Sequence, residues 1–103
     1  MSLPGLDPLI HAPVRLQICA ILSAVDEAEF ALVREETEVS ESVLSKQVKL
    51  LDDAGYVAIR KATFASRQRT WLALTEAGRK AFASHMRALT GLAERAANGI
   101  AAE

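Results

Sequence analysis

The spacing of hydrophobic positions changes along the chain, from helical periods to strand alternation and back. Leu44, Val48 and Leu51 recur at the i, i+4, i+7 spacing of one helix face. Alternating apolar and polar residues follow in two short runs, which predict a pair of strands. The predicted elements, in chain order, are helices over residues 13–24, 30–36 and 41–54, strands over 56–61 and 70–74, and a helix over 76–97. The predicted fold class is therefore α+β and mostly α.

Capping residues support the predicted helix ends. Ser40 is a good N-cap, and Glu41 suits the positive end of the helix that follows. Gly55 ends that helix, because glycine adopts a left-handed conformation without strain. Pro13 suits a first helical turn, and Thr75 is a plausible N-cap for the last helix. Residues 37–40 form the turn between two helices, so 30–54 is a helix-turn-helix in which the first helix supports the second.

The polar face of helix 41–54 differs from an ordinary solvated face. Ser42, Ser45, Lys46 and Lys49 project opposite the apolar stripe, with no carboxylate among them until Asp53. Short hydroxyls and cations on one helix face suit close approach to phosphates and hydrogen bonds to base edges in a DNA major groove. Gln47 lies nearer the flank of this face. We therefore expect 41–54 to be a DNA recognition helix that uses these five residues.

The two predicted strands form a hairpin with a basic tip. Val57 and Ile59 of the first strand and Leu72 and Leu74 of the second should face the interior, and residues 62–68 should form a polar connection. The cations of the hairpin are candidates for contacts to phosphates or a minor groove: Arg60, Lys61, Arg67 and Arg69. The alternative is a solvated hairpin whose charges only prevent edge-to-edge pairing.

The last helix carries a seam of apolar residues at coiled-coil spacing. The members of this seam recur at i, i+4, i+7, i+11 and i+14: Phe82, Met86, Leu89, Ala93 and Ala96. The preceding elements already close a core, so the seam is expected to pack on a second copy of the chain. The alternative is that it folds back on its own domain. Gly99 and the residues after it are expected to fray.

The start of the chain contains two prolines and a glycine within eight residues, so it should be extended or irregular. Its apolar residues are expected to dock, either on the last helix of a partner subunit or only partly, as a tail: Leu3, Leu6, Leu9 and Ile10. The expected domain division is an N-terminal extension (1–11), a DNA-binding domain (12–75), a dimerisation helix (76–98) and a frayed tail (99–103).

Charge is distributed unevenly along the 103 residues, although the net charge is only −1. Residues 40–80 contain eight Lys or Arg and four acids, a local charge of +4, and the rest of the chain carries −5. The local field matters more than the net charge when a surface meets DNA. The positive charge therefore coincides with the predicted recognition helix and hairpin.

The residue types that carry catalysis or bind metals do not form a site. Cys19 is the only cysteine and lies in an apolar run, which favours a buried thiol over a redox sensor. His11 and His85 lie in separate regions without a nearby nucleophile, and the run of Glu35, Glu36 and Glu38 has no adjacent histidine or cysteine. We expect no enzyme activity, cofactor or metal. The longest apolar run is too short to span a membrane and no secretory signal opens the chain, so a cytoplasmic location is expected.

Three segments resemble a known family. The residues that carry the resemblance are Ser42-Val43-Leu44-Ser45-Lys46-Gln47-Val48-Lys49-Leu50-Leu51, then Ala54-Gly55-Tyr56-Val57, then Thr70-Trp71-Leu72-Ala73-Leu74-Thr75-Glu76-Ala77-Gly78-Arg79. They are similar to the recognition helix, wing strands and following helix of winged-helix transcriptional regulators of the MarR-like and ArsR-like kinds, with a weaker match over 13–22. Arg15 resembles an arginine that these regulators often carry. Phe64 and Ala65 depart from the family pattern, since many wings are richer in glycine and less apolar.

The resemblance implies a winged helix-turn-helix domain, with a three-helix core and a two-stranded wing, that binds double-stranded DNA sequence-specifically as a homodimeric transcriptional regulator. A palindromic operator is expected. The alternative is a winged helix that serves as a protein-interaction module without DNA binding. A small-molecule effector between the dimer helices and the DNA-binding domain, near Leu9, Phe82 and Met86, is compatible with the first hypothesis.

Overall fold

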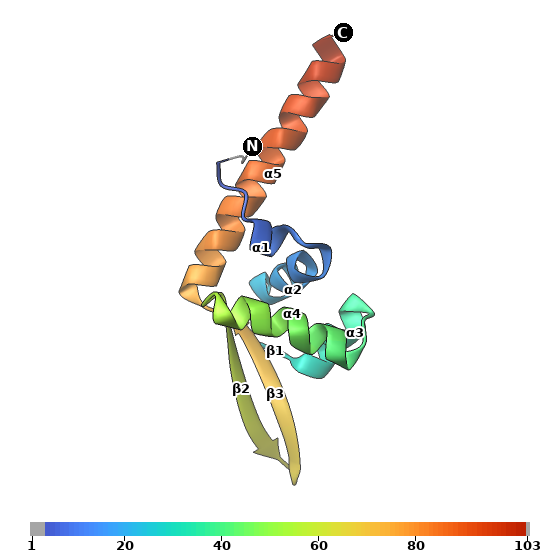
Figure 1. The fold of residues 1–103 in the computed structure, drawn as a ribbon, viewed down its shortest axis with the longest axis vertical. Coiled ribbons are helices and arrows are strands. Elements are labelled where there is room, and N and C mark those ends of the chain that lie inside the picture. Colours follow the sequence, from blue (N-terminus) through green and yellow to red (C-terminus); the bar gives the residue numbers. More distant parts are fainter. Residues whose placement is uncertain (1–3, 103) are drawn as a thin grey trace.

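The structure, a computed structural model of the chain, describes residues 4–102. It is mostly helical with one small antiparallel sheet, which confirms the predicted fold class (Figure 1). The elements, in order, are α1 (Pro8–His11), α2 (Pro13–Ser23), β1 (Ala28–Glu29), α3 (Phe30–Thr37), α4 (Glu41–Asp53), β2 (Val57–Phe64), β3 (Arg67–Leu74) and α5 (Glu76–Ala102).

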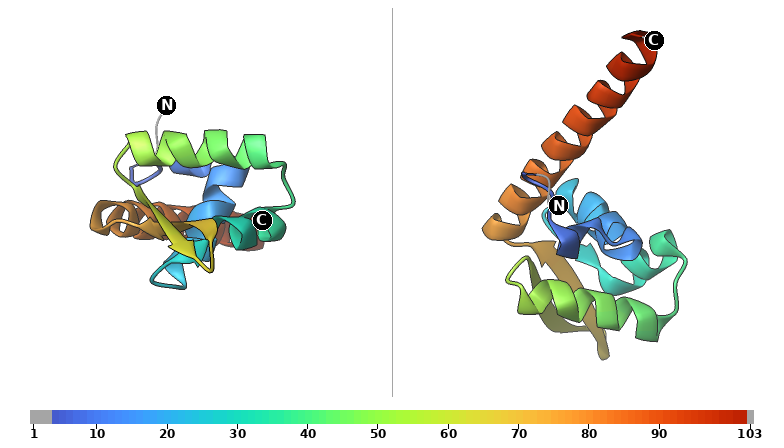
Figure 2. Two further views of the ribbon diagram at one scale, coloured as in Figure 1. Left: turned by 90° about the horizontal axis from the view of Figure 1, so that it is seen from below. Right: turned by 45° about the horizontal axis from the view of Figure 1, so that its top comes forward.

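The molecule is elongated because two elements extend from a central cluster of helices in opposite directions. The β2–β3 hairpin projects from one end and α5 from the other, while α1 to α4 lie between them (Figures 1 and 2). The principal-axis extents are 62 × 25 × 23 Å. Helix α4 lies at one surface of the central cluster, so one whole side of it is free of other elements (Figure 2).

The sheet has the strand order β1-β3-β2, with β1 contributing only two residues. The pairing of β2 with β3 runs from Val57 opposite Leu74 to Phe64 opposite Arg67. The predicted polar connection over 62–68 is therefore wrong, since only Ala65 and Ser66 lie outside the strands. Both have positive φ, +52° and +66°, which a two-residue turn that follows the strand twist requires. The expected signal, glycine or asparagine, is missing from this turn.

The core lies where the stripes of α2, α3 and α4 meet the base of the sheet. Its fully buried side chains include Ile18, Leu22, Val33, Leu44, Leu51 and Leu72. Val57 and Leu74 are buried as predicted, but Ile59 is 40% exposed, so its predicted burial is wrong. Ile59 lines the open groove between the hairpin and α4, which leaves its side chain only partly covered.

The N-terminal segment is more ordered than predicted. The Asp7 carboxylate caps the short helix α1 by accepting from the backbone N–H groups of Leu9 (2.9 Å) and Ile10 (3.4 Å). Ile10 is fully buried and Leu9 is partly buried against the core, so this segment docks on α2, α4 and α5 of its own chain. Leu3 lies outside the described residues.

Helix α5 begins as predicted and ends later than predicted. The Thr75 hydroxyl accepts from the N–H of Gly78 at 3.0 Å and so caps the first turn. The helix continues to Ala102, past Gly99, and fraying from Gly99 stays a prediction. Among the described residues, no helix combines the length and the apolar composition that crossing a bilayer requires.

Candidate nucleic-acid interface

The free side of α4 carries the short polar and cationic side chains that the sequence placed there. Ser42, Ser45, Lys46 and Lys49 are all exposed, opposite the buried stripe of the helix. The helix is fixed at its start by Ser40, whose hydroxyl accepts from the N–H of Val43 at 3.2 Å. These four residues therefore project to solvent from a capped helix, where their polar contacts, Ser42 with Ser40 and Lys49 with Asp53, are both exposed.

Gln47 behaves differently from its neighbours on α4. It is half-buried, and its side-chain oxygen accepts a 2.6 Å hydrogen bond from Nη1 of Arg15 on α2. Nε of the same guanidinium donates to the Leu9 carbonyl at 2.6 Å. Gln47 thus ties the recognition helix to the rest of the domain, and its acceptor oxygen is occupied.

The lysines of α4 are weakly held. Lys49 pairs with Asp53 one turn later at 3.1 Å, and both side chains are more than half exposed. Such exposed i,i+4 pairs contribute about 0.5 kcal/mol or less. Lys46 forms no ion pair with any described residue. Both ammonium groups can therefore turn to a phosphate at little cost.

A groove of about 470 Å³ separates α4 from the hairpin. Ser45, Lys49 and Lys61 line it, and carboxylates stand at its helix side: Glu41 and Asp52. Apolar side chains from both walls also line it, Val48 from α4 and Ile59 from the hairpin. The groove thus joins recognition-helix and hairpin cations, while its two acids limit where a phosphate could approach.

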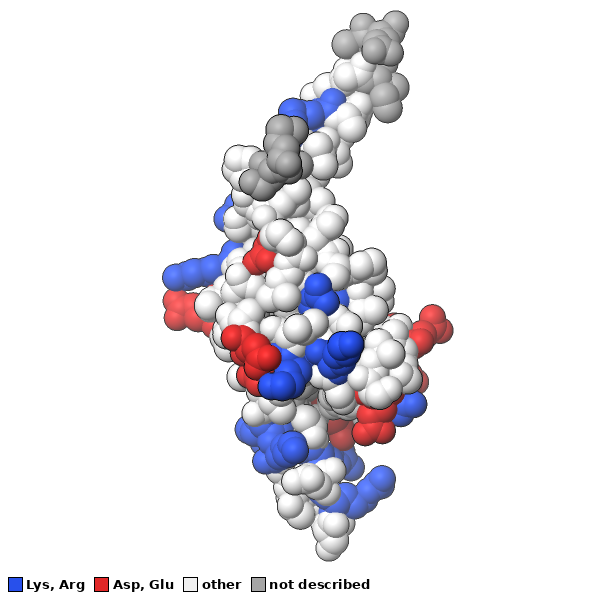
Figure 3. Space-filling view, viewed as in Figure 1, with Lys and Arg blue, Asp and Glu red and all other residues white. Residues whose placement is uncertain are grey.

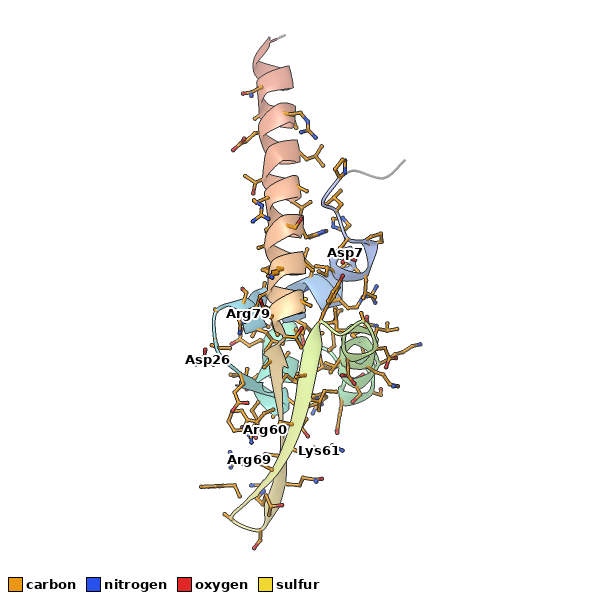
Figure 4. All side chains as sticks on the ribbon, turned by 90° about the vertical axis from the view of Figure 1, so that its left-hand side faces the viewer. Asp7, Asp26, Arg60, Lys61, Arg69 and Arg79 are labelled. Carbon is orange, nitrogen blue, oxygen red and sulfur yellow. The ribbon has the colours of Figure 1, made fainter. Side chains whose placement is uncertain are left out.

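Strand alternation divides the hairpin cations between two sides. Lys61 projects toward the side on which α4 lies, whereas Arg60 and Arg69 project to the opposite side (Figure 4). Arg60 pairs with Glu27 at 2.6 Å and lies over the Trp71 ring, 5.6 Å from its centroid. Arg69 approaches Glu29 at 3.5 Å. The structure therefore brings Lys61 together with the α4 lysines and separates Arg60 and Arg69 from them.

The hairpin tip combines a cation with an exposed aromatic ring. Phe64 is 67% exposed, and the guanidinium of Arg69 lies 5.5 Å from the centroid of its ring. Arg67, opposite Phe64 in the ladder, is exposed and lines a second hollow of about 380 Å³ together with Gln68 and Glu41. Arg67 forms no ion pair with the residues that the structure describes.

Two exposed apolar residues of α4 were missed by the sequence analysis. Val43 is 41% exposed and Leu50 is 38% exposed. Both fall outside the Leu44, Val48, Leu51 stripe, and this departure was the available signal. Apolar side chains on a recognition helix suit contact with the thymine methyl group in a major groove.

Lysine and arginine side chains predominate over the hairpin and are mixed with acidic side chains over the middle of the molecule (Figure 3). Not all cations of residues 40–80 belong to this surface. Arg79 on α5 donates to the Val25 carbonyl at 2.9 Å, beyond the end of α2, and Lys80 pairs with Glu76 at 3.3 Å. The cations that remain near the free side of α4 are Lys46, Lys49 and Lys61. Arg67, at the hairpin tip, shares its strand face with Arg69.

The expected subunit seam of α5 is divided by burial. Phe82 is only 9% exposed and packs in the core of its own domain, together with residues of α2 and the sheet. Met86 is 38% exposed, Leu89 is half-buried, and Ala93 and Ala96 are exposed. Leu92, which the sequence analysis did not single out, is 39% exposed beside them. The part of the seam beyond Phe82 is thus at least partly uncovered by its own domain.

Neither the cysteine nor the metal-binding residue types of the described segment form a second site. Cys19 is fully buried, and burial raises the pKa of its thiol to about 11, so it is protonated at neutral pH. Among residues 4–102, no group of three or more histidine, cysteine, aspartate or glutamate side chains is arranged to hold a metal ion.

Comparison with known proteins assigns the fold to a family. The model of the winged helix DNA-binding domain matches residues 14–93 of the chain. The chain belongs to the winged helix DNA-binding domain family. A protein of Methanocaldococcus jannaschii described as uncharacterized, MJ0432, is 27% identical over 76% of this chain and 85% of its own length.

Solved structures agree with this assignment. A transcriptional regulator homologue from Pyrococcus horikoshii superposes with a TM-score of 0.78 at 23% identity, covering 84% of this chain and 85% of that one. A MarR-family transcriptional regulator from Silicibacter pomeroyi has a TM-score of 0.65 at 26% identity, covering 89% of this chain and 61% of its own. The chain thus has the winged-helix fold that the resemblance implied, and the family it belongs to is a DNA-binding one rather than an enzyme family.

Proposed function

We propose that this winged-helix regulator binds double-stranded DNA sequence-specifically as a homodimer, with α4 in the major groove. The observation that carries the proposal is the free side of α4. Ser42, Lys46 and Lys49 stand there on a capped helix, and no element of the chain covers them. Winged helices bind duplexes by this helix, which fits the width of a major groove.

We assign different tasks to the two kinds of side chain. Lys46, Lys49 and Lys61 neutralise phosphates on the two sides of the groove between α4 and the hairpin, because ammonium groups are strong but sequence-blind partners. The serines and the exposed apolar residues Val43 and Leu50 contact base edges, since hydroxyls hydrogen-bond to bases and apolar groups meet thymine methyls. Arg67 reaches the flanking backbone or minor groove from the hairpin tip.

The proposed dimer forms through the distal part of α5. Met86, Leu89 and Leu92 offer apolar side chains that their own domain leaves at least partly uncovered. A two-fold pairing of such helices would present two α4 helices to half-sites about one helical turn (~34 Å) apart, so the operator is expected to be palindromic. An effector-binding site and a cytoplasmic location remain predictions from the sequence.

The test is a fluorescence titration of the whole protein against mixed genomic DNA at low and moderate salt, followed by selection of bound fragments from a random pool. The proposal predicts binding that weakens steeply with salt and a recovered motif with two-fold symmetry. Binding that does not respond to salt, or no binding, would instead favour a protein-interaction module. A recovered motif without symmetry would contradict the dimer and leave DNA binding intact.

A further inference from the structure

The N-terminal arm, residues 4–11, is attached to α5 through a buried histidine. His85 is fully buried. Its Nδ1 accepts from the backbone N–H of Asp7 at 3.0 Å, and its Nε2 lies 3.1 Å from Nδ1 of His11. The two imidazole rings meet edge to face, with centroids 5.1 Å apart. Both hydrogen bonds that join the arm to α5 therefore depend on nitrogen atoms of the His85 ring.

The two hydrogen bonds of His85 require a particular protonation state of both histidine rings. The Asp7 N–H can only donate, so Nδ1 of His85 is unprotonated and its proton is on Nε2. That Nε2–H donates to Nδ1 of His11, which is then unprotonated too. A second proton on His85 would face the Asp7 N–H, and a second proton on His11 would face Nε2–H. Both hydrogen bonds exist together only when both rings are neutral.

The same arm also holds the recognition helix. The Asp7 carboxylate accepts from the Tyr56 hydroxyl at 2.7 Å, and Tyr56 directly follows the turn that ends α4. The Leu9 carbonyl accepts from Arg15, which in turn donates to Gln47 in the middle of α4. The arm therefore bonds directly to α5 through His85, and it reaches α4 indirectly, through Arg15 and through Tyr56 after the end of that helix.

We propose that His85 is a positioning residue for DNA binding, which holds the arm between α5 and α4 only while both histidines are neutral, so that acid releases the arm and weakens binding. The proposal rests on the DNA-binding function proposed above. His85 acts through Asp7 and the arm, not by touching DNA, because it is fully buried.

The groups around His11 and His85 also favour the neutral form of His85. Burial lowers the pKa of His85 below its ordinary 6.5, the neighbouring His11 lowers it further, and the Asp7 carboxylate acts in the opposite sense. The hydrogen bond to Asp7 raises the pKa of Tyr56, so its hydroxyl stays a donor. The ionisable groups around the arm are Asp7, His11, Arg15, Cys19, Tyr56 and His85.

The sign of the pH effect follows from this lowered pKa. The unfolded chain takes up a proton at His85 near pH 6.5, whereas the folded protein resists it. The stabilisation is therefore complete above pH 6.5 and declines as the pH falls below that value. The arm contact is the part that gives way, since it is the part whose hydrogen bonds need the neutral rings.

The experiment measures DNA affinity, with a selected fragment as probe, from about pH 7.5 to about pH 5.5, the range in which histidine titrates. The chain has only two histidines, so the variant His11→Gln/His85→Asn removes both titrating rings. We expect wild-type affinity to fall about tenfold over this range, the effect of one unmet hydrogen bond, and the histidine-free variant to be flat. An equal fall in both proteins, or a flat wild-type profile, would overturn the proposal.

A second measurement tests the proposal even if the histidine-free variant does not fold or does not bind DNA. An ¹⁵N-imidazole titration of the wild-type protein, with the Asp7 amide followed in parallel, is expected to show the Nε2–H tautomer of His85 and a shift of the Asp7 amide as the rings gain protons. An Asp7 amide that ignores the titration would refute the positioning role. If the wild type binds no DNA at any pH, the proposed function fails, and this titration still decides whether the arm responds to protons.

Discussion

Nη1 of Arg15 donates to the side-chain oxygen of Gln47 at 2.6 Å, which links α2 to the recognition helix. Gln47 is expected from the sequence to touch DNA, but a half-buried amide whose oxygen is occupied serves first to hold α4 in place. Replacing Arg15 with alanine should lower the free energy of unfolding by about 1.5 kcal/mol, because a charge-assisted hydrogen bond is lost. Urea denaturation measures this.

The exposed Arg87 of α5 supplies the control, since Arg87→Ala should change stability by less than about 0.5 kcal/mol. A double-mutant cycle with Gln47→Ala isolates the pair. Additive losses from Arg15→Ala and Gln47→Ala would show that the two side chains do not act together.

Gly78 is required where α5 passes the end of the recognition-helix segment. A Cβ atom there would lie 2.1 Å from the Tyr56 carbonyl oxygen, a backbone atom that also accepts from Thr75 N–H. Gly78→Ala should therefore destabilise the protein by about 3 kcal/mol through overpacking. Gly91 on the same helix meets only the end of the Arg95 side chain at 3.8 Å, so Gly91→Ala should stabilise by about 0.5–1 kcal/mol. Thermal or urea unfolding distinguishes them, and equal effects would contradict the close approach at Gly78.

Neighbouring residues on β2 test which side of the hairpin meets DNA. Lys61 shares a groove with Lys49, whereas Arg60 is paired with Glu27 on the opposite side. Lys61→Ala should weaken DNA binding and reduce the slope of log affinity against log salt by about one, and Arg60→Ala should leave the slope nearly unchanged. The reverse order would mean that the outer side of the hairpin is the DNA-facing one.

The buried thiol provides a test of the redox alternative. Cys19 is fully buried with a pKa near 11, so its thiolate is scarce at neutral pH. A thiol reagent should modify the native protein at less than about one hundredth of the rate for the urea-unfolded chain. Comparable rates would revive a sensing role for Cys19.

The sequence predicts elements whose cause is local and misses those whose cause is contact between distant segments. The Leu44, Val48, Leu51 stripe and the Ser40 and Thr75 caps lie within a few residues of the helices they specify, and those helices form as expected. The length of the hairpin was missed because its turn, Ala65-Ser66, lacks the glycine or asparagine that usually marks one. Only pairing along the whole ladder keeps these residues at positive φ.

The candidate site shows the same division. The exposure of Ser45, Lys46 and Lys49 could be predicted, because the helical period places them away from the buried stripe of α4. The engagement of Gln47 by Arg15 joins residues 32 positions apart, and the pairing of His11 with His85 joins residues 74 apart. No local pattern connects such positions, so the role of the arm emerges only from the folded chain.

One salt titration tests most directly whether the free side of α4 binds DNA phosphates. Fluorescence anisotropy with a selected duplex compares the wild type with Lys46→Ala/Lys49→Ala, using Lys80→Ala on α5 as the matched lysine control. The account predicts that the slope of log affinity against log salt falls by about two for the double variant and is unchanged for the control. An unchanged slope in the double variant, with wild-type affinity, would contradict it.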